Sequence, residues 1–299
     1  MTTSYSELKT IKDLIRFAAS QFNAAGLYFG HGTDNAWDEA TTLVLHALHL
    51  PHHLPTMVFD ARLVAEEKLK LLELIQLRVE KRIPLSYLTH EAWFAGLSFY
   101  VDERVLVPRS PLAELIENRF EPWINPNQVT SILDLCTGSA CIGIACAKMF
   151  PESEVDASDI SDDALAVAKI NVLRHLVENQ VTLYKSDLFD QLPQKQYNII
   201  ISNPPYVDEN DMSHLPKEYL HEPTLGLAAG RDGLDIVKRI LNNAPRYLQK
   251  HGILIVEVGN SEQALIEQFS DYPFTWLSFE RGGGGVFLLT AEQILMRNA

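Results

Sequence analysis

Apolar residues recur at helical spacing through the first third of the chain. Residues 6–23 carry apolar side chains three and four positions apart, which predicts an amphipathic helix. Asp34 or Asn35 can cap a second helix. A third helix is expected over residues 61–81, and Pro84 prevents it from continuing further. The pattern predicts a small helical domain over residues 1–90.

The hydrophobic period changes at residue 91. Residues 91–107 are rich in aromatic and β-branched side chains around the turn sequence Ala95-Gly96-Leu97, which predicts a β-hairpin linker. A short helix is expected next, over residues 112–120.

Beyond residue 130 the chain alternates between short apolar runs and helix-like segments. This alternation predicts an α/β domain over residues 108–299, with a mostly parallel sheet and helices on both of its faces. Residues 274–279 and 285–290 are expected to close it as an antiparallel pair. The other strands are expected at residues 131–135, 154–158, 181–184, 197–202 and 253–258.

Composition narrows the class of protein. The 299 residues are 46% hydrophobic, so a large core can form, and no apolar stretch is long enough to predict a membrane span. The net charge of −14 argues against binding nucleic acid through the overall field, although a local basic patch would be compatible with it. Three cysteines and no pattern of a signal peptide favour a reducing, cytoplasmic location.

Small and acidic residues follow the first two predicted strands of the α/β domain. In such sheets, ligands bind beyond the carboxyl ends of the strands. Gly138 and Gly143 follow the first strand and would let a ligand approach the backbone, while Asp159 follows the second and could accept both ribose hydroxyl protons. Together they indicate a nucleoside cofactor and leave NAD possible.

The fourth strand is followed by the sequence Asn203-Pro204-Pro205-Tyr206. Two prolines fix the backbone and remove N–H donors, so the Asn203 side-chain oxygen and the Pro204 carbonyl can both accept hydrogen bonds. A planar –NH₂ group offers the two donors that such a pair requires, and Tyr206 could stack on its face. Asp187, after the third strand, could accept from an adenine amino group.

These turns resemble those of class I S-adenosylmethionine-dependent methyltransferases that act on planar nitrogen. Further segments resemble the protein-(glutamine-N5) methyltransferase family, and its branch that modifies ribosomal protein uL3. The resemblance covers nearly the whole chain and implies a Rossmann-like sheet with a helical amino-terminal domain. The segments that carry it are residues 107–115, 215–223, 228–235 and 257–261.

The resemblance also assigns residues to roles. It implies that Asn203, Pro204 and Tyr206 are catalytic, and that Pro205, Arg109 and Glu114 join them at the substrate glutamine. S-adenosylmethionine is the expected cofactor, bound by Asp134, Thr137, Gly138, Ser139, Ala140, Asp159, Ile160, Asp187, Leu188 and Asn203. Ala140 replaces a glycine usual in the family, and its methyl group is expected to crowd the cofactor slightly.

Three functions remain open from the sequence. The first is methylation of a protein glutamine, in uL3 or in a peptide chain release factor, with the amino-terminal helices choosing the substrate. The second is amino-methylation of a nucleic-acid base, and the third is a non-catalytic assembly factor. No metal site is expected, since the histidines at positions 46, 49, 52 and 53 lack a cysteine or firm acidic partner.

Overall fold

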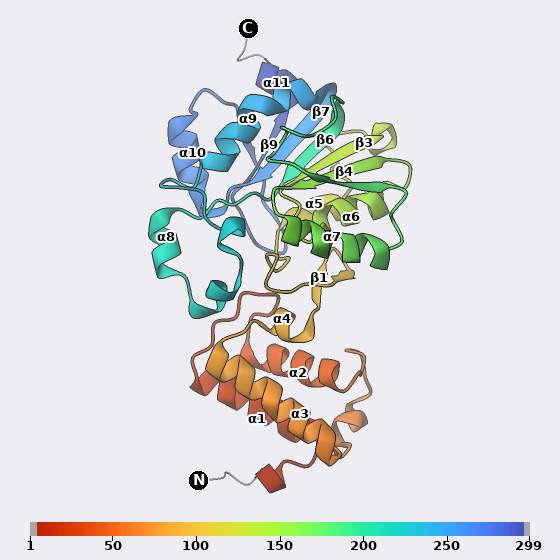
Figure 1. Cartoon of the computed structure of the whole chain (residues 1–299), viewed down its shortest axis with the longest axis vertical. Coiled ribbons are helices and arrows are strands. Elements are labelled where there is room, and N and C mark those ends of the chain that lie inside the picture. Colours follow the sequence, from red (N-terminus) through yellow and green to blue (C-terminus); the bar gives the residue numbers. More distant parts are fainter. Residues whose placement is uncertain (1–4, 296–299) are drawn as a thin grey trace. The chain divides into compact units, whose positions relative to one another are not determined.

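The computed structural model describes residues 5–295, which form two compact units (Figure 1). The first unit comprises the chain up to Glu91 together with Pro216–His221, and the second comprises Ala92–Leu215 and the residues after His221. The amino-terminal domain predicted from the sequence did not include Pro216–His221. No helix in the described part of the chain is long and apolar enough to cross a membrane.

The first unit is built from helices. Asn35 caps α2 by accepting hydrogen bonds from the backbone N–H groups of Trp37 and Asp38, and Thr10 caps α1 through a capping box with Asp13. The helices bury a shared apolar core. Their bounds are η1 (Tyr5–Glu7), α1 (Ile11–Ala24), α2 (Ala36–Ala47), η2 (Thr56–Asp60), α3 (Ala65–Gln76), η3 (Leu77–Lys81) and α4 (Leu85–Thr89).

A buried ionic cluster fixes the later segment within this unit. Glu218, in η5 (Lys217–His221), accepts hydrogen bonds from Arg78 and Arg82 at 3.4 and 3.3 Å. Arg78 is 1% exposed and also donates to Glu39 at 2.5 Å. Since a buried charge is costly unless it is paired, each member of the cluster depends on the others.

The second unit contains a seven-stranded sheet in the order β5-β4-β3-β6-β7-β9-β8. Five strands pair in parallel, while β9 runs antiparallel to its neighbours β7 and β8. The strands are β3 (Ser131–Leu135), β4 (Glu154–Asp159), β5 (Val181–Lys185), β6 (Tyr197–Ser202), β7 (Leu248–Glu257), β8 (Thr275–Trp276) and β9 (Val286–Thr290). The predicted parallel sheet with a closing antiparallel pair is confirmed.

Helices cover both faces of this sheet, as predicted (Figure 1). Alternate residues of each strand pack into two cores, one with α5, α6 and α7 and the other with α9, α10 and α11. The helical segments are α5 (Leu112–Glu117), η4 (Pro126–Gln128), α6 (Cys141–Met149), α7 (Asp162–Arg174), α8 (Glu209–His214), η6 (Thr224–Gly226), α9 (Asp235–Tyr247), η7 (Gly259–Ser261), α10 (Glu262–Gln268) and α11 (Ala291–Leu295).

The hairpin is shorter than the sequence pattern predicted. Strands β1 (Ala92–Phe94) and β2 (Leu97–Phe99) pair around Ala95 and Gly96, but residues 101–107 form no strand. The side chains of Val101, Val105 and Val107 are nevertheless buried, which explains why their apolar pattern resembled a strand.

Candidate active site

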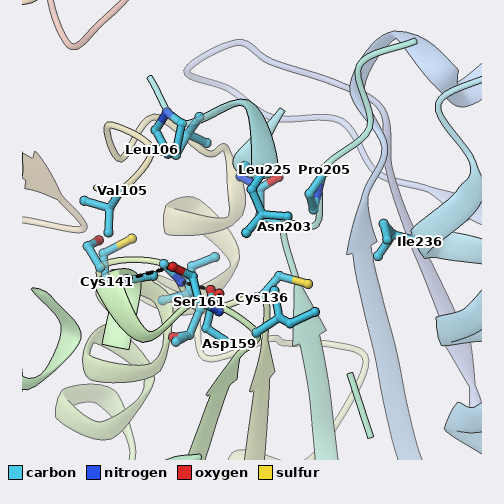
Figure 2. A pocket seen from close by; sticks show the side chains of 18 of the residues that line it. Val105, Leu106, Cys136, Cys141, Asp159, Ser161, Asn203, Pro205, Leu225 and Ile236 are labelled. Atoms are coloured by element: carbon cyan, nitrogen blue, oxygen red, sulfur yellow. Dashed lines mark hydrogen bonds between the residues drawn. The ribbon is translucent and has the colours of Figure 1, made fainter. Parts of the chain in front are cut away.

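A cavity of about 220 Å³ lies at the carboxyl ends of the parallel strands (Figure 2). The turns that follow β3, β4, β5 and β6 all contribute to its wall, as expected for an open parallel sheet. The residue 104–110 loop, the residue 223–228 segment and α9 complete it. Of the predicted site residues, those that line the cavity are Arg109, Thr137, Gly138, Ser139, Asp159, Ile160, Asp187, Leu188, Asn203 and Pro205.

Asp159 organises the turns after β3 and β4. One carboxylate oxygen accepts from the backbone N–H of Gly138 at 2.9 Å, and the other accepts from that of Ser161 at 2.9 Å. Burial raises the pKa of Asp159, while these hydrogen bonds oppose the shift. A carboxylate oxygen can accept more than one hydrogen bond, and Asp159 lines the cavity, so this carboxylate is suited to accept from ligand hydroxyl groups as well.

Asp134 lies beneath the glycine turn and does not line the cavity. Its Oδ2 accepts from Thr137 Oγ1 at 2.5 Å and from the backbone N–H of Gly143 at 2.9 Å. The side chain is fully buried, and this burial raises the pKa of Asp134 to about 7. Its direct role in this structure is to hold the turn.

Ala140 also lies outside the cavity wall, with its methyl group fully buried. Its φ of 63° is in the left-handed region that favours glycine, so the cost of alanine at this position is backbone strain. The structure therefore gives no support to the expectation that its methyl group crowds the cofactor.

Asp187 and Leu188 line the cavity after β5. The Asp187 carboxylate pairs with Arg239 of α9 at 2.9 Å, and both side chains are partly exposed. The sequence did not identify Arg239 or its neighbour Ile236, which also borders the cavity. Both lie on a helix more than forty residues further along the chain, with no local motif.

Asn203 places a buried amide oxygen at the cavity. Its Oδ1 is shielded from solvent and has no hydrogen-bond partner among the described residues. Figure 2 shows Asn203 with Pro205 at the end of β6, with Asp159 on another part of the same wall. A buried polar atom left unpaired is costly, so this oxygen is suited to accept from a ligand donor.

Pro204 and Tyr206 do not line the cavity. The Tyr206 hydroxyl donates to Glu257 at 3.0 Å, and its backbone carbonyl accepts from Ser261 at 2.8 Å. Tyr206 is therefore held by two residues, Glu257 and Ser261, that lie outside the cavity wall. The expected stacking of Tyr206 on a substrate amide and the expected acceptor role of the Pro204 carbonyl both remain predictions.

Arg109 is anchored by an acid that the sequence analysis did not assign. It donates to both oxygens of Glu222, at 2.5 and 2.7 Å, and Glu222 also accepts from the backbone N–H of Val107. Glu114 does not line the cavity; it accepts from the backbone N–H groups of Glu280 and Arg281. Glu222 lies in the segment 215–223 that carried the family resemblance, in the sequence His221-Glu222-Pro223. That sequence by itself does not show that Glu222 lies close to Arg109.

Comparison with known proteins identifies the family. A model of the methyltransferase small domain matches residues 120–222. Two curated relatives are both named ribosomal protein uL3 glutamine methyltransferase. The relative from Francisella tularensis subsp. tularensis is 50% identical over 97% of this chain and 93% of its own. The relative from Xanthomonas campestris pv. campestris is 54% identical over 98% and 95%.

The chain belongs to the ribosomal protein uL3 glutamine methyltransferase family. The resemblance and the enzyme class predicted from the sequence are confirmed, and S-adenosylmethionine is the methyl donor. Two structures of the hMettl16 catalytic domain, with hairpins 6 and 1 of the MAT2A 3'UTR, share the fold at a TM-score of 0.51. They are 18% and 19% identical, covering 76% and 83% of this chain and 81% and 90% of theirs, which shows the fold alone.

The cavity fits this methyl donor. Asp159 offers acceptors suited to ribose hydroxyls, the turn at Gly138 brings backbone close to the cavity, and Leu188 and Ile160 offer apolar surface. A side-chain carbon at Gly138 would meet nothing within 4 Å, so the space beside this turn is open.

Proposed function

We propose that this protein transfers the methyl group of S-adenosylmethionine to the side-chain amide nitrogen of a glutamine in ribosomal protein uL3. The names of its relatives support uL3 as the substrate. The buried Oδ1 of Asn203, which has no partner among the described residues, supports the binding of an amide –NH₂ group. A glutamine –NH₂ group offers the donor that this oxygen lacks.

The proposed mechanism relies on orientation. An amide nitrogen is a poor nucleophile because its lone pair is delocalised into the carbonyl group. Asn203 Oδ1 and the Pro204 carbonyl would each accept one amide hydrogen and hold the nitrogen in line with the methyl group. As the nitrogen–carbon bond forms, the bond from the methyl carbon to the sulfonium sulfur would break, and the nitrogen would lose one of its two protons to water. S-adenosylmethionine supplies an electrophilic methyl group when it is bound. The rate gain comes from positioning and preorganised dipoles, which can each supply several kcal/mol.

In the same proposal, residues around the carboxyl ends of β3–β6 hold the cofactor. Asp159 would accept from the ribose hydroxyls, and Asp187 with Leu188 would hold the adenine ring, next to Arg239. Arg109, fixed by Glu222, would border the entrance for the substrate glutamine. The reaction would take place in the cytoplasm, which suits a ribosomal substrate and three free cysteines.

Mass analysis of candidate substrates tests the proposal. Purified uL3, release factors and duplex DNA are incubated separately with the enzyme and S-adenosylmethionine, and the modified residue is mapped by peptide fragmentation. We expect uL3 alone to gain the mass of one methylene group, on a glutamine side chain. Modification of a release factor or of DNA, with uL3 unchanged, would contradict the proposed substrate.

Asn203→Ala is the matched test of the chemical role. Removing one preorganised acceptor is expected to lower turnover by at least about 100-fold, which corresponds to roughly 3 kcal/mol in the barrier. Binding of S-adenosylmethionine, measured by calorimetry, should largely survive because Asp159, Asp187 and the Gly138 turn are proposed to hold most of the cofactor. Near-normal single-turnover rates in the variant would rule out the role proposed for this oxygen.

A further inference from the structure

Glu257 is a buried acid that the cofactor and substrate contacts above do not use. It is the last residue of β7, is 5% exposed, and does not line the cavity. Burial raises the pKa of Glu257, while hydrogen bonds from Ser110 and Tyr206 act in the opposite direction. A buried carboxylate is costly unless it is hydrogen-bonded, so Glu257 depends on these two donors.

Its two hydrogen bonds come from two different loops of the site. Ser110 Oγ donates at 2.5 Å and the Tyr206 hydroxyl donates at 3.0 Å, each to a different oxygen of Glu257. Ser110 lines the cavity itself, next to Arg109, and Tyr206 is next in sequence to the lining residue Pro205. One carboxylate therefore sets the separation of two walls of the site.

The remaining contacts of Tyr206 leave its ring little freedom. Ser261 holds its backbone carbonyl at 2.8 Å. Gly259 lies against the ring so closely that a side-chain carbon there would come within 2.4 Å of Tyr206 Cε2. Glu257 fixes the far end of the ring, so the turn that begins at Asn203 is held at three points from behind.

We propose that Glu257 is a positioning residue for methyl transfer. By binding Ser110 and Tyr206 together, it fixes the Arg109 loop relative to the turn of Asn203, and so orients the substrate amide. This inference rests on the proposed function for the identity of that amide. A displacement of about 1 Å at the reacting groups can cost about 100-fold in rate, so the effect belongs in kcat and not in cofactor affinity.

Glu257→Ala and Glu257→Gln form the matched pair of variants. Alanine removes both hydrogen bonds and is expected to lower kcat by at least about tenfold, with the Kd for S-adenosylmethionine unchanged. Glutamine has the same length and can accept from one hydroxyl and donate to the other, so it should restore most of the rate. Equal losses in the two variants, or a parallel loss of cofactor affinity, would overturn the proposal.

Glu257→Asp provides a second route if the alanine variant does not fold. It keeps the charge but is one methylene shorter, so it cannot reach both loops in the same positions. We expect its kcat to lie well below that of Glu257→Gln. An aspartate variant that is as fast as the wild type would overturn the proposal.

A double-mutant cycle separates this role from general destabilisation. Tyr206→Phe removes only the hydroxyl that Glu257 binds. If Glu257 acts through Tyr206, the variant that combines Tyr206→Phe with Glu257→Ala should lose little more kcat than Glu257→Ala alone. Fully multiplicative losses would contradict an effect transmitted through this hydrogen bond.

Hydrogen exchange tests the same contact without any methyl acceptor. In the cofactor-bound protein, Glu257→Ala should speed exchange of the backbone N–H groups of Arg109, Ser110 and Leu112 together with those of Asn203, Tyr206 and Val207. Glu257→Gln should change it little. Unchanged exchange in both segments would overturn the proposal. Should the wild type fail to methylate uL3, the proposed substrate would be wrong while the exchange result would still decide the role of Glu257.

Discussion

Asn203 and Asp134 each carry a buried oxygen without a hydrogen-bond partner among residues 5–295, yet their surroundings give them different roles. The Asn203 oxygen belongs to a residue that lines the cavity, where a ligand donor can reach it. Asp134 lies behind the glycine turn and uses its other oxygen to hold Thr137 and Gly143. Burial alone therefore does not identify a catalytic group; access to the cavity does.

Asp159→Ala tests the cofactor role of a residue that both lines the cavity and holds the turn. A charge-assisted hydrogen bond contributes about 1.5–3 kcal/mol, so the Kd for S-adenosylmethionine should rise by at least about tenfold. Asp162→Ala is the control, because this nearby carboxylate is largely exposed and pairs with Lys185. Equal calorimetric affinities of the Asp159 variant and the wild type would restrict Asp159 to holding the Gly138 turn.

Asp134 should make stability depend on pH. The folded-state pKa of about 7 exceeds the ordinary value of 3.8, so the folded protein binds a proton more tightly than the unfolded chain. The contribution of Asp134 to stability is therefore greatest below about pH 4 and falls as the pH rises to about 7.

Asp134→Asn cannot titrate and should flatten this dependence. Between about pH 5 and pH 7, the change in unfolding free energy should differ between the two proteins by on the order of 2 kcal/mol. Urea unfolding of the cofactor-free proteins measures it. Parallel pH profiles for wild type and variant would show that Asp134 does not carry the effect.

Sequence patterns located the elements of the sheet well because their cause is local. The strands β3 and β6 and the cap of α2 at Asn35 appear where apolar runs and capping residues predicted them. β7 begins earlier than expected, at Leu248. The expected run began at residue 253 because the intervening Gln249-Lys250-His251-Gly252 is polar and gives no apolar signal.

The site was predictable only in its local turns. Asn203 and Gly138 follow strands and Asp159 ends one, so the sheet topology alone brings them to one edge. The contacts of Arg109 with Glu222 and of Ser110 with Glu257 join residues 113 and 147 positions apart. No periodicity encodes such pairs, since they depend on how loops distant in the sequence pack against one another.

The ionic cluster of the first unit shows the same dependence on distant segments. Arg78 in η3 pairs with Glu39 of α2 and with Glu218 of η5, all nearly inaccessible to solvent. Arg78→Met would leave both carboxylates buried without the positive charge of Arg78, and should destabilise the protein by on the order of 3–5 kcal/mol. Arg16→Met, at an exposed position of α1, is the control. Similar urea midpoints for the two variants would contradict the importance of the cluster.

The charge of the whole molecule is unevenly distributed between its parts. Residues 1–91 contain nine Lys or Arg and eleven Asp or Glu, whereas residues 92–299 contain 16 and 28. The acidic excess thus belongs mainly to the methyltransferase part. Electrostatic attraction of a basic ribosomal protein should weaken with added salt, and this part would supply most of it.

We expect the first unit to decide which protein is methylated. A glutamine side chain is too small to identify a protein, so specificity requires additional surface, and the helical unit carries no residue of the cavity. The test is a chimera that takes this unit from a release-factor glutamine methyltransferase. Because Pro216–His221 belongs to the unit and Glu218 pairs with Arg78, both segments must be exchanged together.

This chimera should gain activity on release factors and lose activity on uL3, while the salt dependence of the rate changes little. A chimera that exchanges residues 1–91 alone is the matched control; it should be less stable because it separates Arg78 from its native partner Glu218. If the full chimera still methylates uL3 at the original rate and ignores release factors, recognition must come from the methyltransferase part. The Arg109 loop is then the first candidate, because it borders the cavity and is fixed by Glu222 and Glu257, which both lie outside the helical unit.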